Sequence, residues 1–504
     1  MRTDIREMRR RLSDHHVGKR LIRRTLAIFA VYALITILLP MSSAYAQGTD
    51  IPDPTIPINT VWTLVAAFLV FFMQAGFLAL EAGACRPRET VNLLLEDFID
   101  VALTGLVFYL FGFAFMFGEG NSFIGTTGFA LTDLGSWNST YVSAGYDFGV
   151  PLGAFWLFQF AFASTAATIA SGAMIGRTGF WANLGYTALV SGVIYPIVGH
   201  WLWHPQGWLA KEGALDFAGS TVVHTMGAMV AITGVITLGP RLGRKFAKDG
   251  GGPMPYHNYT LIALGTLILW FGWFGFNPGS TLSGMNTSAI SLIAFNTNLA
   301  GCTGALAAMF LYYFQSKKWD LVYACNGCLA GLVAITAPCA FVSPFSAAII
   351  GLVGGIIVTL VIQAEEVLRL DDVVTAFPVH GANGIWGTLS IGLFAQKSYQ
   401  FTLAESARVD GLFLGGGLDQ LATQFLASAS AVAFGFSIFL GFFLLLKYVG
   451  VLRIPASVEI EGVDLVLHGT PAYPGMLIDT NDGTPTSIEP VIKAGVSRAA
   501  AAGD

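Results

Sequence analysis

The sequence predicts an all-α protein that crosses a membrane many times, and three observations lead to this prediction. Of the 504 residues, 54% are hydrophobic and only 11% are charged, whereas about 25% are charged in soluble domains. Apolar stretches of about 20 residues, long enough to cross a bilayer as a helix, recur along the chain. The 59 glycines suit close helix packing in lipid. We predict eleven transmembrane helices, arranged as two inverted five-helix repeats plus one extra helix.

The first 46 residues have the pattern of a secretory signal peptide. Residues 1–24 are rich in Arg and Lys, residues 26–39 form an apolar run, and Ala44 and Ala46 supply small residues before Gln47. Cleavage after Ala46 would leave residues 47–59 as an external N-terminal segment. The alternative is an uncleaved anchor, which the shortness of the apolar run disfavours.

A predicted membrane domain extends from residue 60 to residue 447. The approximate cores of its eleven spans are 60–84, 98–117, 152–175, 180–201, 219–239, 258–276, 286–314, 321–338, 346–363, 378–395 and 422–447. Basic residues crowd the alternate loops that carry Arg86, Arg88, Arg177, Arg241, Arg244, Lys245, Lys248, Lys317, Lys318 and Arg369. The other loops carry Lys211, Lys397 and Arg408. The positive-inside rule therefore predicts an external N-terminus and a cytoplasmic C-terminus.

The chain turns polar after Lys447. We expect residues 448–474 to form a short ordered cytoplasmic tail. Residues 475–504 lack apolar periodicity and are predicted to be disordered. No stretch has the composition of a soluble globular domain, which argues against a fused kinase or cyclase module.

Two histidines lie inside predicted spans. His224 belongs to DFAGSTVVHTMGAMVAITG (216–234), and His380 belongs to FPVHGANGIWG (377–387). An ionisable side chain within a membrane is costly and by default marks a permeation path or a proton relay. The alternative is that each is a core histidine satisfied by a neighbouring hydroxyl. Because the same Val-His pattern occurs in both halves of the chain, we favour a functional role, with His380 somewhat deeper than His224.

Asp216 precedes His224 by eight residues, or about 12 Å along a helix. This spacing places Asp216 at the start of the helix, where a carboxylate can cap free backbone N–H groups. The alternative is a direct ligand role, and the two are compatible, since a capping acid can still bias a nearby site toward cations.

Aromatic residues gather where several spans end. Trp203 ends GHWLW, Phe276 precedes the Asn-Pro-Gly-Ser turn that ends at Ser280, and Phe162 lies in the third span. Such residues often serve only as interface anchors or as packing. An aromatic face beside a hydroxyl is, however, what recognition of a small cation requires, since the ring attracts charge and the oxygen accepts an N–H bond.

Other kinds of chemistry find little support in the sequence. Cys325 and Cys328 have CxxC spacing, but no second ligand pair completes a zinc site. No grouping of nucleophile, base and oxyanion donors points to an intramembrane enzyme. We expect a protein that is not an enzyme, has no metal or cofactor and binds no nucleic acid.

Five stretches together resemble the ammonium transporter (Amt/Mep/Rh) family, and in particular its bacterial Amt-type members. They are WTLVAAFLVFFMQAGFLALEAG (62–83), GALDFAGSTVVH (213–224), FGWFGFNPGS (271–280), NGCLAGLVAITAPCAFVSP (326–344) and FPVHG (377–381). The similarity runs in order from Thr60 to about Pro474. It implies eleven helices, an external N-terminus, a homotrimer with one pore per chain, and a place in the bacterial inner membrane.

The resemblance also implies roles for individual residues. An outer cation site would comprise Trp203 and Ser280 with a contribution from Phe158, and Asp216 would be the essential acid near it. Phe162 and Phe276 match a stacked gate, and His224 and His380 match the twin histidines of the pore. A PII-type regulatory protein would dock on the cytoplasmic face, at GPRLGRKF (239–246) and EIEGVDLVLHG (459–469).

The chain departs from the family pattern at several positions. Glu96 and Asp97 stand where relatives often carry a basic or amide residue. Many relatives have proline or glycine in place of Val373 or Thr375, and some have aspartate at Thr375. Pro338 replaces a usual glycine. None of these positions belongs to the matched pore residues.

The predicted function is ammonium transport. A bare ion faces a large desolvation penalty in a low-dielectric pore, whereas neutral ammonia faces little. We therefore expect NH4+ to be recruited outside, deprotonated below the phenylalanine gate and conducted as ammonia along the histidines, supplying nitrogen to the cell. Whether the proton follows is left open. The alternatives are an Rh-like neutral gas channel, which the cation-recruiting pair Trp203 and Ser280 argues against, and an ammonium sensor acting through a partner.

Overall fold

The computed structural model describes residues 54–135, 137, 139–473, 476–478 and 485–487. The predicted signal peptide (1–46) lies outside the described residues, as does most of the segment 475–504 that we predict to be disordered. The first helix begins at Thr55, so part of the predicted external segment 47–59 is helical.

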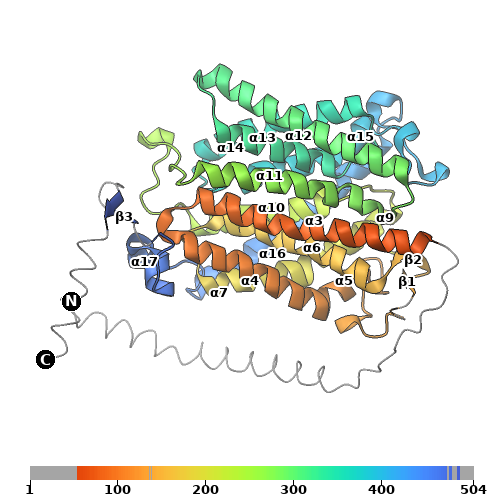
Figure 1. Ribbon diagram of the computed structural model, residues 1–504, viewed down its shortest axis with the longest axis horizontal. Coiled ribbons are helices and arrows are strands. Elements are labelled where there is room, and N and C mark those ends of the chain that lie inside the picture. The colour runs from red at the N-terminus through yellow and green to blue at the C-terminus, as the bar shows by residue number, and fades with distance from the viewer. Residues whose placement is uncertain (1–53, 136, 138, 474–475, 479–484, 488–504) are drawn as a thin grey trace. The chain divides into compact units, whose positions relative to one another are not determined.

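The described chain is mostly helical (Figure 1). Its first half contains α3 (Thr55–Ala84), η1 (Pro87–Glu89), α4 (Thr90–Val107), η2 (Phe108–Gly112), α5 (Phe113–Phe117), η3 (Phe129–Leu131), β1 (Thr140–Ser143), β2 (Tyr146–Pro151), α6 (Leu152–Met174), α7 (Phe180–Leu189), η4 (Val190–Ile194), α8 (Tyr195–Trp203), α9 (Trp208–Lys211), η5 (Ser220–Thr225), α10 (Met226–Leu238) and η6 (Ala247–Asp249). Its second half contains α11 (Tyr259–Phe276), η7 (Pro278–Thr281), α12 (Thr287–Ser316), α13 (Leu321–Thr336), α14 (Pro344–Leu368), η8 (Phe377–Ala382), α15 (Asn383–Phe394), η9 (Lys397–Tyr399), η10 (Glu405–Ala407), η11 (Leu412–Leu414), α16 (Asp419–Tyr448), α17 (Ala456–Glu461), η12 (Asp464–His468), β3 (Met476–Ile478) and β4 (Pro485–Ser487).

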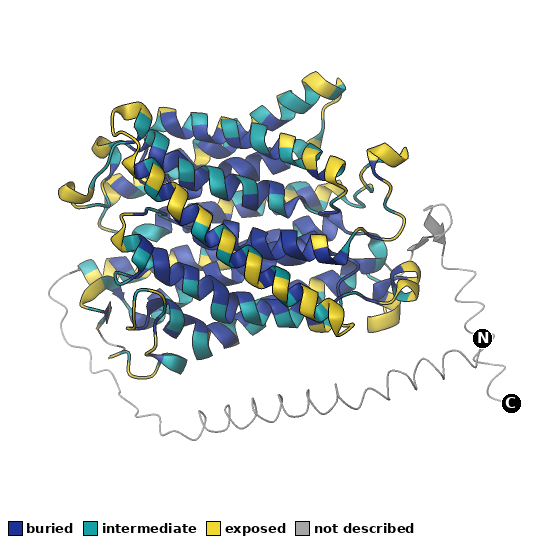
Figure 2. Ribbon diagram, turned by 180° about the vertical axis from the view of Figure 1, so that it is seen from behind, coloured by how far each residue is buried: buried dark blue, intermediate teal, exposed yellow. Residues whose placement is uncertain are grey.

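The helices confirm a multi-pass membrane protein. Within the described residues, nine helical segments are long and apolar enough to cross a membrane. The shorter α13 and the pair η8–α15 occupy the two remaining predicted positions, which is consistent with eleven spans. Figure 2 shows buried residues along the inner faces and exposed ones on outer faces and loops, and large apolar residues such as Phe68, Leu267 and Phe425 are more than half exposed. An apolar exterior of this kind is suited to lipid.

The second span begins earlier than predicted. Its core was expected at 98–117, but the helical segment extends from Pro87 to Phe117. Glu96 and Asp97 therefore lie within the span, and both are buried. The predicted core began after the acidic pair because the two charges interrupt the apolar run, whereas both side chains are buried inside the bundle.

The fifth helix of each half runs antiparallel to the other. Thr221 Oγ1 lies 2.5 Å from Thr388 Oγ1, and His224 Nδ1 lies 3.2 Å from His380 Nδ1. The residue number therefore increases along one helix in the direction in which it decreases along the other. Both helices begin with a π-helical turn that carries the histidine, η5 in one and η8 in the other. This opposed pairing fits the two inverted repeats that we predicted.

The two ends of the bundle are distinguishable. The antiparallel β1–β2 hairpin lies at one end, the hairpin end, and α17 lies at the other, the tail end (Figure 1). At the tail end, the Asp464 carboxylate accepts bonds from the N–H groups of Val91 and Asn92 at 3.0 and 2.9 Å. Glu459 accepts from the Leu242 N–H at 2.6 Å and pairs with Arg453 at 2.8 Å. These bonds connect the tail segment from Arg453 to Asp464 to α4 and to the loop that follows α10.

A buried ion pair stabilises the tail end. Asp371 accepts from the Arg241 main-chain N–H at 2.9 Å and from Arg241 Nε and Nη2 at 2.8 and 2.9 Å. Burial alone would raise the pKa of Asp371, but the Arg241 hydrogen bonds and the charges of Arg241 and Arg177 hold it well below its usual value. A depressed pKa contributes stability above the unfolded value of about 3.9, and this stability is lost as the pH falls toward the folded value.

We expect Asp371→Asn to lower the free energy of unfolding by about 3–5 kcal/mol at pH 7, because it leaves the Arg241 guanidinium buried without its partner. Thermal unfolding of the purified protein in detergent measures this. The matched control is Asp249→Asn, which breaks the exposed pair with Arg369 and should cost about 1 kcal/mol or less. Equal melting temperatures for the two variants would contradict the prediction.

Candidate functional site

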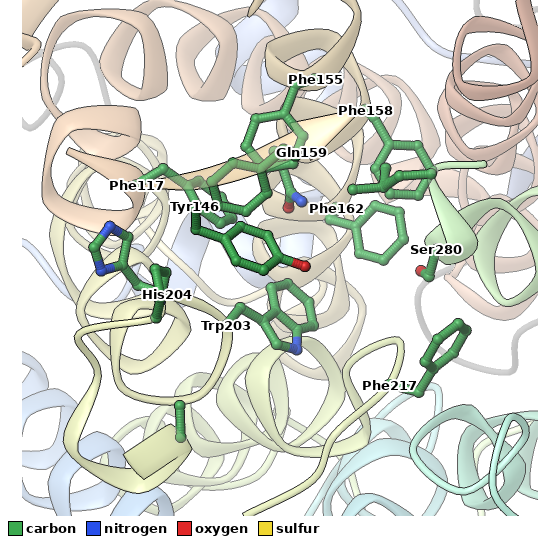
Figure 3. A pocket seen from close by; sticks show the side chains of 14 residues that line it. Phe117, Tyr146, Phe155, Phe158, Gln159, Phe162, Trp203, His204, Phe217 and Ser280 are labelled. Carbon is green, nitrogen blue, oxygen red and sulfur yellow. The ribbon is translucent and has the colours of Figure 1, made fainter. Parts of the chain in front are cut away.

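A cavity of about 320 Å³ lies at the hairpin end (Figure 3). Its lining is mostly aromatic: Phe117, Tyr146, Phe148, Phe155, Phe158, Gln159, Phe162, Trp203, His204, Pro205, Ala210, Phe217, Ser280 and Leu282. Four predicted site residues, Phe158, Phe162, Trp203 and Ser280, meet here although they come from α6, α8 and η7. Aromatic faces with a hydroxyl and no lysine or arginine suit a small cation. We call this cavity the hairpin-end pocket.

Trp203 and Ser280 are held by hydrogen bonds to main-chain oxygens. Trp203 Nε1 donates to Asp216 O at 2.6 Å, and Ser280 Oγ donates to Phe276 O at 2.8 Å. Gly219 lets the Trp203 ring lie close to the main chain, since a Cβ at this position would lie only 3.2 Å from Trp203 Cη2. The φ of Gly219, +110°, also favours glycine. Because both donors are already used, Ser280 presents oxygen lone pairs and Trp203 presents its ring face to the pocket.

Asp216 does not line the hairpin-end pocket, and its carboxylate caps the next helix. Oδ1 accepts from the N–H groups of Gly219 and Ser220 at 2.8 and 2.9 Å, and Oδ2 accepts from those of Thr221 and Val222 at 2.9 and 3.0 Å. Burial raises the pKa of Asp216, and these backbone hydrogen bonds oppose the rise. The capping position predicted from the sequence is confirmed. Asp216 reaches the pocket through its main-chain bond to Trp203.

A stack of rings leads from the pocket into the bundle. The ring centroids of Phe158 and Phe162 are 4.6 Å apart, and those of Phe162 and Phe276 are 4.0 Å apart with nearly parallel planes. Phe276 in turn stacks on His224 at 5.4 Å. Phe276 does not line the hairpin-end pocket, so the Phe162–Phe276 pair lies between the pocket and the histidine.

His224 and His380 are in direct contact. Their Nδ1 atoms are 3.2 Å apart and their ring centroids 5.2 Å apart. Both side chains are buried, and His224 Nε2 has no protein hydrogen-bond partner. A hydrogen bond between the two Nδ1 atoms needs one donor and one acceptor, so in a neutral pair one ring has a bare Nε2 and the other an Nε2–H. The pair can therefore offer one acceptor and one donor to a passing polar molecule.

The β1–β2 hairpin also contributes to the pocket, which we did not predict from the sequence. Tyr146 and Phe148 of β2 line it, and Figure 3 shows Tyr146 projecting toward Trp203 and Phe162. His204 anchors the hairpin, because its ring contacts Ser143 Oγ at 3.0 Å. The signal available in the sequence was the density of aromatic residues between 141 and 155, which we did not connect with Trp203.

The segment around Thr375 lies beside the pore histidine His380. Val374 and Ala376 line a small cavity with His380, while Val373 and Thr375 line a second cavity of about 350 Å³ on the tail-end side. Thr375 has a φ of +56°, a strained conformation for a β-branched residue. The departures at Val373 and Thr375 therefore lie in the wall between these two cavities.

The described residues suggest no metal centre. No group of three or more His, Cys, Asp and Glu side chains within them is placed to hold a metal ion. Cys325 and Cys328 are buried free thiols.

Comparisons with known proteins agree with this geometry. Residues 61–473 match the Ammonium Transporter Family. The chain is 42% identical over 461 residues to ammonium transporter Amt2 of Archaeoglobus fulgidus, covering 88% of this chain and 94% of that protein. It superposes with a TM-score of 0.73 on a solved structure titled "Sensor Amt Protein", at 38% identity and with coverage of 82% of this chain and 98% of the other. It also superposes on Mep2 of Candida albicans with a TM-score of 0.74, at 27% identity and with coverage of 82% and 90%.

Proposed function

This chain belongs to the Ammonium Transporter Family, and from that premise we propose that it recruits NH4+ in the hairpin-end pocket, strips one proton and conducts ammonia past His224 and His380. One observation carries the proposal: the pocket, the Phe162–Phe276 pair and the histidines form a continuous stack of rings. The members of this family are transporters rather than enzymes, and we assign no catalytic residue.

The pocket supports the recruitment step. An ammonium ion carries N–H donors and a positive charge, and the pocket offers the complement: the Ser280 lone pairs and the faces of Trp203, Phe158 and Phe162. The capped carboxylate of Asp216 adds a negative charge behind Trp203. A neutral gas channel of the Rh type would have no use for such a site.

The geometry below the pocket supports conduction of ammonia rather than of the ion. The Phe162 and Phe276 rings stack with centroids 4.0 Å apart, and an ion that loses its hydration shell in an apolar lumen pays a desolvation cost of many kcal/mol. Ammonia avoids that cost, and the acceptor and donor of the histidine pair can bind it in passing. Loss of the proton therefore has to occur near the phenylalanine pair.

We further propose that the hairpin end faces the outside of a bacterial inner membrane and that uptake supplies nitrogen. The basic residues of the loop 239–248 lie at the tail end, as the positive-inside rule requires of the cytoplasmic side. The tail residues Glu459 and Asp464 bond to the Leu242 N–H and to the start of α4. This joint surface is a suitable docking site for a PII-type partner, and family membership leads us to propose a homotrimer.

A sensing role is the second candidate. One solved relative is titled a sensor, and a chain that uses this fold for sensing would respond to ammonium through a partner. Current and uptake recorded together separate the possibilities. In liposomes that contain purified protein, the transport proposal expects rapid ammonium-dependent uptake that protein-free liposomes lack. Ammonium binding without flux would support sensing and contradict the proposal.

The role of Trp203 can be tested by measuring uptake at several ammonium concentrations. Trp203→Leu should weaken recruitment by about 0.5–2 kcal/mol, the range of a cation–π contact, so that uptake falls most at low ammonium. Uptake measured across ammonium concentrations should show a raised half-saturation with a maximal rate near that of wild type. The matched control is Trp181→Leu, a tryptophan on α7 that is 66% exposed. If the two variants transport alike at limiting ammonium, Trp203 is only an interface anchor.

A further inference from the structure

Four carboxyl groups lie buried together in the membrane domain without a basic partner. Glu81 is on α3, and Glu96, Asp97 and Asp100 are on α4. Each is at most 3% exposed, and the described residues form no ion pair with any of them. Both carboxylate oxygens of Asp97 lack a hydrogen-bond partner, as do Glu96 Oε1 and Asp100 Oδ2. We call these residues the acid cluster.

Glu81 connects the acid cluster to the histidine pair. Glu81 and His380 line one cavity of about 20 Å³, whose other walls are apolar. A cavity needs about 10–15 Å³ to hold one water molecule, so the cavity that the His380 imidazole and the Glu81 carboxyl both line has room for a single water. Gly172 leaves space for the Glu81 side chain, because a Cβ at position 172 would lie 2.7 Å from Glu81 Cδ.

The acid cluster has to hold protons. Two ionised carboxylates in a low-dielectric interior repel each other, and without a cation the favoured state has a proton shared between them. Glu81 has a hydrogen-bond donor beside it, because Ser171 Oγ donates to Glu81 Oε2 at 3.2 Å. An acid pair that holds one proton retains an oxygen that can accept another.

We propose that Glu81, backed by Asp97, takes the proton that ammonium leaves on the histidine pair and passes it toward the tail end, separately from ammonia. This inference rests on the proposed function. An imidazolium at His380 gives its proton to the cavity water, and that water gives a proton to a Glu81 carboxylate oxygen. The products are a neutral histidine, a neutral carboxylic acid and an intact water molecule, and no electrons are transferred. Ammonia continues past His380, so one ammonia and one proton cross for each ammonium.

Glu81→Gln tests this assignment because the amide keeps the size of the side chain but cannot take up the proton. Purified protein in liposomes is given a pulse of ammonium chloride while current and internal pH are recorded. Wild type should carry inward current. In Glu81→Gln the current should fall about 100-fold, the lower end of the range for a positioned proton-transfer group. The variant should still admit ammonia, which makes the liposome interior more alkaline. Glu81→Asp should restore part of the current, and Asp97→Asn should lower it.

The matched control is Glu365→Gln. Glu365 on α14 is also a buried carboxyl with an unpartnered oxygen, but it does not line the cavity of Glu81 and His380, and its variant should keep the current. The proposal is overturned if Glu81→Gln keeps the current, if Glu365→Gln loses it equally, or if wild type admits ammonia without any current. Loss of current and ammonia flux together would also overturn it, since Glu81 would then support the pore itself. Wild-type liposomes without ammonia flux would instead contradict the proposed function.

Discussion

Replacing His224 or His380 with alanine should abolish most ammonium-dependent flux, and each single change should cost much of what the double change costs. The two rings share one Nδ1–Nδ1 hydrogen bond of 3.2 Å, so each fixes the tautomer and orientation of the other. Residues that act as a unit are not additive. We expect a loss of about 100-fold or more for each variant, as for removal of a positioned proton-transfer group. Uptake and current in liposomes, measured on His224→Ala, His380→Ala and the double variant, check this.

His224→Glu provides a sharper test of the same pair. A carboxylate could keep a proton relay, but it leaves a bare charge beside Phe276 and should relax selectivity against other monovalent cations. The control is His257→Ala, because His257 bonds to Cys85 O and Tyr473 Oη, away from the pore. The prediction would be contradicted if the losses of flux in the two single variants multiplied in the double variant. It would also be contradicted if the double variant still conducted ammonium selectively. The histidines would then be core residues, with selectivity left to Trp203 and Ser280.

The sequence named candidate site residues, but it could not predict how they meet. Trp203, Phe158, Phe162 and Ser280 were assigned from motif similarity, and the structure places them in one pocket. The contact of His224 with His380 could not be predicted, because 156 residues separate them in the chain. Their meeting depends on two π-helical turns in antiparallel helices, and no periodicity in the sequence encodes that arrangement. Tyr146 was missed for a related reason, since a hairpin outside the spans carries it.

Buried acidic residues are also hard to predict from the sequence. Glu96 and Asp97 fell outside the predicted core of the second span because charged side chains end an apolar window, yet both are buried within that span. Hydropathy averages over a window and cannot register which face a side chain occupies. The same averaging hid Glu81, which stands near the end of the first span and acquires its meaning only from the cavity that it shares with His380. Function within a membrane depends on such interior-facing polar groups.

Asp216→Ala should cost about 3–5 kcal/mol of stability, because backbone N–H groups buried at the start of η5 would lose their acceptor. Four N–H groups depend on this carboxylate. Truncating an exposed cap costs about 1 kcal/mol, whereas each buried donor left unsatisfied costs about 1–3 kcal/mol. The loss should extend to transport, since the Asp216 main-chain oxygen holds Trp203 at 2.6 Å. Melting temperature and concentration-dependent uptake, measured on the same preparation, separate the two effects.

Asp320→Asn provides the control for Asp216→Ala. Asp320 caps α13 through the N–H groups of Val322 and Tyr323. It lines the cavity on the tail-end side and not the hairpin-end pocket. Its amide variant should cost about 1 kcal/mol of stability and leave the half-saturation for ammonium unchanged. In the folded fraction of Asp216→Ala we expect the half-saturation to rise at least as much as in Trp203→Leu, because both the orientation of Trp203 and the nearby negative charge are lost. A stable Asp216→Ala protein with wild-type uptake would show that the cap supports neither the fold nor the cation site. A destabilised protein with an unchanged half-saturation would confine Asp216 to a structural role.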